Sequence, residues 1–180
     1  MKKILLPILF SISSFCYGQQ YNETTKTLWL RAEKRQYSLG DYTGAMQDYN
    51  KIIEINPEAE YFYWKRGLLK ASLGDEVGAI QDYTKAIQIY YPKKYHPMPV
   101  YYQARGQSKM KLGDYRGAIQ DFNKAIVLAP EYGWFYYWRG LSKVKIGDKN
   151  GGCLDFSKTG ELGSSEGIEK AYEAIKTYCN

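Results

Sequence analysis

Apolar and polar residues alternate along most of the chain with the period of an α-helix rather than that of a β-strand. After Gly74, for example, apolar side chains fall three, four and seven positions apart, at Ala79, Ile80, Tyr83, Ala86 and Ile87. This spacing places them on one face of a helix. Similar apolar periodicity precedes and follows each of several Gly-Asp pairs. The chain is therefore predicted to consist of helices joined by tight turns.

The Gly-Asp pairs belong to a sequence unit that occurs four times. The turn glycines lie 34, 39 and 34 residues apart, at Gly40, Gly74, Gly113 and Gly147. A second aspartate and an aromatic residue follow each turn at a constant distance, as Asp48-Tyr49, Asp82-Tyr83, Asp121-Phe122 and Asp155-Phe156. The turn glycine can end a helix in the left-handed conformation, and the aspartate beside it can cap the next helix. Each unit is therefore predicted to be an antiparallel helix pair.

Small residues flank each turn and favour close packing of the two helices. Gly67, Gly106 and Gly140 lie seven residues before their turns, and small residues lie five residues after the turns at Ala45, Ala79, Ala118 and Gly152. A bulky side chain at Gly106 is expected to force the two helices apart.

In period and in these residues the chain resembles the tetratricopeptide repeat (TPR) family. The best-matched copies run from Tyr63-Trp64-Lys65-Arg66-Gly67 to Ala86, and from Tyr102-Gln103-Ala104-Arg105-Gly106 to Pro130. The resemblance implies an all-α fold, an α-solenoid of four helix–turn–helix repeats closed by a C-terminal capping helix. The expected bounds are 1–18 for a signal peptide, 19–163 for the repeats (about 26–59, 60–93, 99–132 and 133–163) and 164–180 for the cap.

Some positions depart from the pattern. Counting back from Gly40 puts Glu33 where the other repeats have glycine, and Thr159 replaces an alanine in the last repeat. The connector between repeats two and three, residues 90–99, contains three prolines and cannot be regular helix. It is interpreted as a tolerated insertion, with a loop reaching over the groove as the alternative.

The N-terminal residues have the composition of a secretory signal peptide. Lys2 and Lys3 precede the apolar stretch from Ile4 to Phe15, and Gly18 suits cleavage before Gln19. The mature chain would keep 23 basic and 19 acidic residues, a net charge of +4, interspersed rather than gathered into a nucleic-acid-binding stripe. The protein is therefore expected to be exported, to the periplasm, the cell envelope or the exterior, without stable membrane insertion of the mature chain and without a nucleic-acid partner.

The residues that carry chemistry are few. His96, the sole histidine, lies between prolines with no partner for catalysis or zinc, and no phosphate-binding glycine loop appears. We therefore expect no enzyme activity, no metal and no cofactor. Cys153 lies near the start of the last repeat's second helix, and Cys179 lies at the end of the cap. Antiparallel packing of these helices would bring the two cysteines together as a disulfide that stabilises the cap by about 2–4 kcal/mol.

Three arginines, Arg66, Arg105 and Arg139, precede the close-packing glycines and have the recurring aspartates as partners. Each arginine either pairs within its own repeat or reaches the aspartate of the preceding repeat. Pairing with the preceding repeat is possible because repeat one has the aspartate, Asp48, but has Ala32 where the other repeats have the arginine.

By the TPR resemblance, the first helix of each repeat lines a concave groove. The groove residues implied are Leu30, Arg31 and Lys34 in repeat one; Trp64, Lys65 and Leu68 in repeat two; Gln103 and Gln107 in repeat three; and Trp134, Tyr137, Trp138 and Leu141 in repeat four. Trp64, Tyr137 and Trp138 do not recur as a set, which favours a binding role over repeat packing. The asparagine–lysine clamp that some members use for C-terminal carboxylates is not intact here.

These features predict a protein–protein interaction scaffold of the cell envelope that holds an extended peptide or a helix in its groove. The alternative is a structural module that assembles with itself or with a larger complex through its convex surface or edges. A carbohydrate binder or hydrolase that uses the aromatic end is a third possibility. The partner's identity does not follow from the residues.

Overall fold

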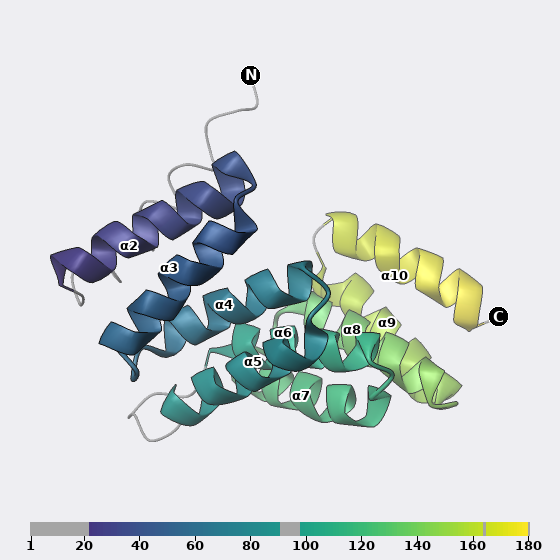
Figure 1. Cartoon of the computed structure of the whole chain (residues 1–180). Coiled ribbons are helices and arrows are strands. Elements are labelled where there is room, and N and C mark those ends of the chain that lie inside the picture. The colour runs from purple at the N-terminus through teal and green to yellow at the C-terminus, as the bar shows by residue number, and fades with distance from the viewer. Residues whose placement is uncertain (1–21, 91–97, 164, 180) are drawn as a thin grey trace. The chain divides into compact units, whose positions relative to one another are not determined.

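The computed structural model describes residues 22–90, 98–163 and 165–179, which are helical apart from short turns (Figure 1). The predicted signal peptide and most of the proline-rich connector with His96 lie outside the described residues. The chain forms two compact units, one ending at Glu58 and the other beginning at Ala59.

The first unit contains repeat one. Helix α2 (Glu23–Lys34) continues into a π-helical turn, η1 (Arg35–Leu39), and α3 (Tyr42–Ile55) returns antiparallel to it. Asn22 caps α2 by accepting a hydrogen bond from the Thr25 N–H at 2.8 Å. Asn56 then donates to the Thr25 hydroxyl at 2.7 Å, which joins the two ends of the unit. The core of this unit includes Ala32, Ala45, Tyr49 and Ile52, all with no exposed surface.

The second unit contains repeats two to four and the closing helix. Its helices are α4 (Glu60–Ser72), α5 (Glu76–Tyr90), α6 (Pro99–Lys111), α7 (Tyr115–Leu128), α8 (Gly133–Lys145), α9 (Lys149–Leu162) and α10 (Ser165–Tyr178). Each of these helices packs on its neighbour in sequence. In addition α4 contacts α6, α6 contacts α8, and α8 contacts α10, so the first helices of the repeats form one layer that α10 extends. The predicted all-α fold, with four helix–turn–helix repeats and a capping helix, is confirmed.

The turns have the predicted chemistry. The four turn glycines have φ angles of 65°, 87°, 82° and 90°, and they are the positive-φ residues of the described chain. The aspartate after each glycine caps the next helix by accepting a backbone hydrogen bond from the third residue on, as between Asp114 and the Gly117 N–H at 2.8 Å. Both helix ends at each turn are thus satisfied without a longer loop.

Glycine is required where paired helices cross because an aromatic ring of the second helix fills the space. A Cβ atom added at Gly67 would lie 2.5 Å from Tyr83 Cε1, and one added at Gly140 would lie 2.7 Å from Phe156 Cε1. Tyr83 is 1% exposed and Phe156 is fully buried, so both rings are packed among the side chains around them. Close packing of α4 on α5 and of α8 on α9 therefore depends on these glycines.

Gly67→Ala is expected to lower the free energy of unfolding by about 1–3 kcal/mol, because the methyl group overpacks the contact with Tyr83. The matched control is Gly160→Ala in α9, where the nearest atom to the added Cβ is the Ala171 Cβ at 3.8 Å. That change should raise stability by up to about 1 kcal/mol through helix propensity. Urea denaturation of both variants measures the two effects, and a loss of equal size at both positions would contradict the packing explanation.

Candidate functional site

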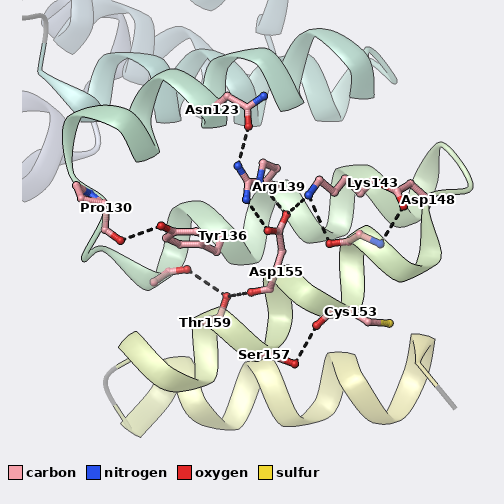
Figure 2. A network of polar contacts seen from close by, with 12 residues as sticks. Asn123, Pro130, Tyr136, Arg139, Lys143, Asp148, Cys153, Asp155, Ser157 and Thr159 are labelled. Carbon is pink, nitrogen blue, oxygen red and sulfur yellow. Dashed lines mark hydrogen bonds and ion pairs between the residues drawn. The ribbon is translucent and has the colours of Figure 1, made fainter.

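A buried aspartate anchors the two helices of each repeat in the second unit. In repeat four, Arg139 donates two hydrogen bonds to Asp155, Nε to Oδ2 at 2.8 Å and Nη2 to Oδ1 at 2.6 Å (Figure 2). Lys143, one helical turn further on, lies 2.9 Å from Asp155 Oδ2. The same arrangement recurs as Arg66–Asp82–Lys70 and Arg105–Asp121–Lys109. These charges therefore belong to the architecture of each repeat.

Each arginine pairs with the aspartate of its own repeat, so the alternative of pairing with the preceding repeat's aspartate is wrong for this unit. Two of these arginines nevertheless contact the preceding repeat of this unit through another residue. Arg105 Nη1 donates to Thr84 Oγ1 at 3.1 Å, and Arg139 Nη1 donates to Asn123 Oδ1 at 2.7 Å (Figure 2). One guanidinium thus joins its own helix pair and also ties that pair to the one before it.

Repeat one has the same ion-pair anchor, but its arginine lies one residue before the position found by counting back from Gly40. Arg31 makes the bidentate contact with Asp48, at 2.9 and 2.6 Å, and Arg35 takes the place of the lysine, 2.8 Å from Asp48 Oδ2. The π-helical turn contains one more residue than the corresponding turn of repeat two. The Asp41 N–H donates to the carbonyl of Arg35, six residues back, whereas the Asp75 N–H donates to the carbonyl of Lys70, five residues back. Ala32, not Glu33, therefore takes the position of Gly67, and the placement of Glu33 at the glycine position is wrong.

The charges around Asp48 make the first unit sensitive to acid. Burial raises the pKa of Asp48, but hydrogen bonds and charges from Arg31 and Arg35 outweigh burial and hold the pKa below its ordinary value of 3.8. A lowered folded-state pKa stabilises the fold above the unfolded-state value and loses that contribution as the pH falls through the folded-state value. Thermal melts should therefore show stability falling below pH 3.8, with a shallower acid limb for Asp48→Asn. An equally steep limb in the variant would contradict this role.

A pocket opens on the α4–α6–α8 layer of the second unit. Its volume is about 480 Å³, and its lining comes from every helix between α4 and α8. Three predicted groove residues meet here, Leu68 from α4, Gln107 from α6 and Trp138 from α8. The wall is mainly apolar, with Ala71, Ala104, Met110 and the rings of Tyr83 and Tyr115. The size and lining are those of a site that accepts a large apolar side chain or a small organic group.

Other predicted groove residues of this unit lie elsewhere or are packed against neighbours. Trp64 packs on the core between repeats two and three, with its ring centroid 5.9 Å from that of Tyr101. Lys65 is only 6% exposed and lies beside the rings of Tyr61 and Trp64. Both residues therefore contribute to packing, contrary to the expectation of an open groove contact.

The aromatic residues of α8 form a row that continues from the pocket. Tyr137 lies edge-on to Trp134, at 5.5 Å, and to Trp138, at 5.3 Å. Burial raises the pKa of Tyr137, whose neighbours include Lys170, Glu173 and Tyr178 of α10. Tyr137 therefore fixes α8 against the closing helix, while Trp138 faces the pocket. Gln103 and Leu141 are half-buried on the same layer but do not line the pocket.

The residues predicted for the groove in repeat one belong to the first unit. Arg31 pairs with Asp48, and its side chain is 46% exposed. Lys34 and Leu30 are exposed on α2. Because positions in α2 are displaced by one residue, Trp29 rather than Leu30 is equivalent to Trp64. Trp29 is only 5% exposed.

The comparisons with known proteins agree with this geometry. A family model described as TPR repeat matches residues 34–74 and 106–147. These two segments of the chain are similar to TPR repeats.

Solved TPR-like structures have the same fold at low sequence identity. MamA is 22% identical with a TM-score of 0.73, over 88% of this chain and 84% of that one. The TPR domain of Arabidopsis OM64 is 21% identical, with a TM-score of 0.61, over 68% of this chain and 95% of that domain. The first TPR of Spaghetti (RPAP3), solved with the HSP90 peptide SRMEEVD, is 20% identical, with a TM-score of 0.57, over 67% of this chain and 94% of that one. No curated protein matches the sequence significantly.

Two lysines at the pocket were not predicted from the sequence. Lys111 and Lys145 both line the pocket, and each stands two residues before the turn glycine of its repeat. They lie four residues after Gln107 and Leu141, which is one helical turn along the same face. The repeat spacing therefore indicates both lysines once the groove face of each first helix is extended to the end of that helix.

The closing helix is joined to the last repeat by a disulfide between Cys153 and Cys179, with their Cα atoms 5.8 Å apart. Around it, α10 packs on α9 and contacts α8, with Ala171 and Ala174 buried at the contact. Among the described residues no group of His, Cys, Asp and Glu is arranged to hold a metal ion. No helix in the described part of the chain is long and apolar enough to cross a membrane.

Proposed function

We propose that this protein is a protein–protein interaction scaffold whose second unit holds a peptide or helix of a partner in the pocket lined by Leu68, Gln107 and Trp138. The observation that carries the proposal is the pocket itself, an apolar recess of about 480 Å³ on the layer of first helices. An aromatic residue in such a recess is typical of a binding hot spot. The RPAP3 structure provides a precedent for peptide binding by this fold.

We further propose that the protein acts outside the reducing cytosol, in the periplasm, the cell envelope or the exterior. Two features support this location, the signal-like composition of residues 1–18 and the pairing of Cys153 with Cys179. Disulfides persist in oxidising compartments and are rare in the cytosol.

The binding proposal is tested by selecting from a phage-displayed library of random peptides on the immobilised protein. The same selection is run on Trp138→Ala and on Lys85→Glu, whose site is exposed on α5 outside the pocket. We expect the protein and Lys85→Glu to enrich the same apolar sequences, and Trp138→Ala to lose them while keeping its helical circular dichroism. Enrichment that survives Trp138→Ala, or the absence of any enrichment, would refute the pocket as the binding site.

A second candidate is self-assembly through α10. Ile168 is 50% exposed and Tyr172 is 70% exposed, and they lie one helical turn apart on α10. Apolar side chains on a terminal helix favour association, because the ends of a repeat stack are normally polar. Analytical ultracentrifugation of the protein and of Tyr172→Lys tests this candidate, which predicts an oligomer that the substitution dissociates.

A further inference from the structure

The pocket on the α4–α6–α8 layer has an uneven distribution of charge. Its lining contains two lysines, Lys111 and Lys145, and no aspartate or glutamate. The lysines stand at equivalent positions of repeats three and four, near the C-terminal ends of α6 and α8. A ligand in the apolar recess therefore meets positively charged side chains and no negatively charged ones in the lining.

The two lysines differ in how they are held. Lys111 Nζ lies 2.7 Å from Glu76 Oε1, and Glu76 is only 8% exposed at the start of α5. This ion pair holds Lys111 in place and neutralises most of its charge. Lys145 is exposed and has no ion pair with any described residue, whereas Lys143, two residues earlier, is bound to Asp155. Lys145 is thus the uncompensated charge of the pocket.

Lys145 stands at a defined distance from the apolar anchor point of the pocket. It follows Trp138 by seven residues on α8, so the two side chains lie on the same face two turns apart. At the rise of an α-helix this separation is about 10 Å along the axis. An extended peptide covers that distance in about three residues.

We propose that the partner segment carries a large apolar side chain for the pocket and a carboxylate, from aspartate or glutamate about three residues away, that pairs with Lys145. The inference rests on the proposed peptide-binding function and adds the chemistry of the peptide. Charge complementarity selects the acid, because the pocket offers an uncompensated cation and no competing carboxylate in its lining. The acid gives orientation, since it fixes which end of the segment lies toward the C-terminus of α8.

The peptides selected from the displayed library provide the first test. Sequences enriched by the protein and lost on Trp138→Ala should carry an acidic residue at a fixed distance from the apolar one. Selection on Lys145→Glu should keep the apolar residue and replace the acid by lysine or arginine. Lys85→Glu alters an exposed lysine outside the pocket and should give the same acidic sequences as the unchanged protein.

A charge exchange with synthetic peptides then measures the contact. The selected peptide and a version with its acid changed to lysine are titrated against the protein, Lys145→Gln and Lys145→Glu by fluorescence anisotropy. Lys145→Glu should raise the Kd of the acidic peptide by about threefold to tenfold, because it removes an exposed ion pair and adds repulsion. It should tighten binding of the lysine peptide by a similar factor, and Lys145→Gln should give intermediate values for both.

The outcomes separate the two proposals. Pocket-dependent peptides without an acidic preference, or equal effects of Lys145→Glu and Lys85→Glu, would overturn the assignment of the carboxylate and leave the binding site intact. The absence of any pocket-dependent peptide would overturn both. Reciprocal rescue in the charge exchange is the result that the inference requires, because a structural effect of Lys145 would weaken both peptides alike.

Discussion

Asp121→Ala is expected to lower the free energy of unfolding by about 3–5 kcal/mol, because the aspartate is a buried charge on which two cations converge. Asp121 is 2% exposed, accepts hydrogen bonds from Arg105 at 3.0 and 2.6 Å, and lies 2.8 Å from Lys109. Removing it leaves a guanidinium and an ammonium group, each about 80% buried, without their common partner. Urea denaturation followed by circular dichroism measures the loss.

The matched control for Asp121 is an exposed ion pair of the same unit. Lys158 lies 2.8 Å from Glu161, with both side chains largely exposed. Glu161→Ala should change stability by less than about 1 kcal/mol, as is typical of surface pairs. A loss for Asp121→Ala no larger than that for Glu161→Ala would show that the anchor contributes little to the repeat.

Loss of the Cys153–Cys179 bond is expected to lower the free energy of unfolding by about 2–4 kcal/mol, since the cross-link closes a loop and restricts the unfolded chain. The sequence separation of the two cysteines is 26 residues. Because α10 terminates the stack and packs mainly on α9, we expect its amides to lose protection from hydrogen exchange before those of α6 and α7. The double variant Cys153→Ser/Cys179→Ser, compared with the intact protein by hydrogen exchange and urea denaturation, measures both effects.

Reduction provides an independent control for the disulfide. The reduced protein should match the double serine variant in stability, and reductant should leave that variant unchanged. Intact-mass analysis after alkylation without reductant should show no free thiol on these two cysteines. Two alkylated thiols would refute the bond, and equal stability with and without it would show that α10 is held by packing alone.

Much of the fold could be predicted because the repeat makes local signals coincide. The Gly-Asp pair specifies both the end of one helix and the cap of the next, and it does so four times. The aspartate eight residues after each turn glycine is buried because an arginine on the facing helix pairs with it. The sequence shows the arginines and the aspartates but not which arginine pairs with which aspartate. The packing of the facing helices decides that pairing.

The register of repeat one could not be predicted by counting from the turn. A π-helical turn adds one residue between Arg35 and Gly40, so every position before it is displaced by one. The displacement moved Arg31 out of the ion-pair position and into the predicted groove. The signal that was available is the Arg31–Arg35 spacing, which matches Arg66–Lys70, Arg105–Lys109 and Arg139–Lys143.

The binding face was predicted in part for a related reason. Family resemblance identified the first helices, and the structure brings Leu68, Gln107 and Trp138 together at the pocket. Whether an aromatic side chain faces solvent or a neighbouring repeat depends on the rotation of each helix, which a single sequence does not show. Trp64 was therefore assigned to the groove although it packs between repeats, and Lys145 was overlooked.

The most direct test of the central claim is to locate a bound peptide by methionine methyl NMR. Met110 lines the pocket, whereas Met46 lies on α3 in the first unit. On titration with a peptide selected by the protein, we predict a saturating shift of the Met110 methyl signal, an unchanged Met46 signal, and no Met110 shift in Trp138→Ala. Peptide binding that leaves Met110 unperturbed would contradict the assignment of this pocket as the binding site.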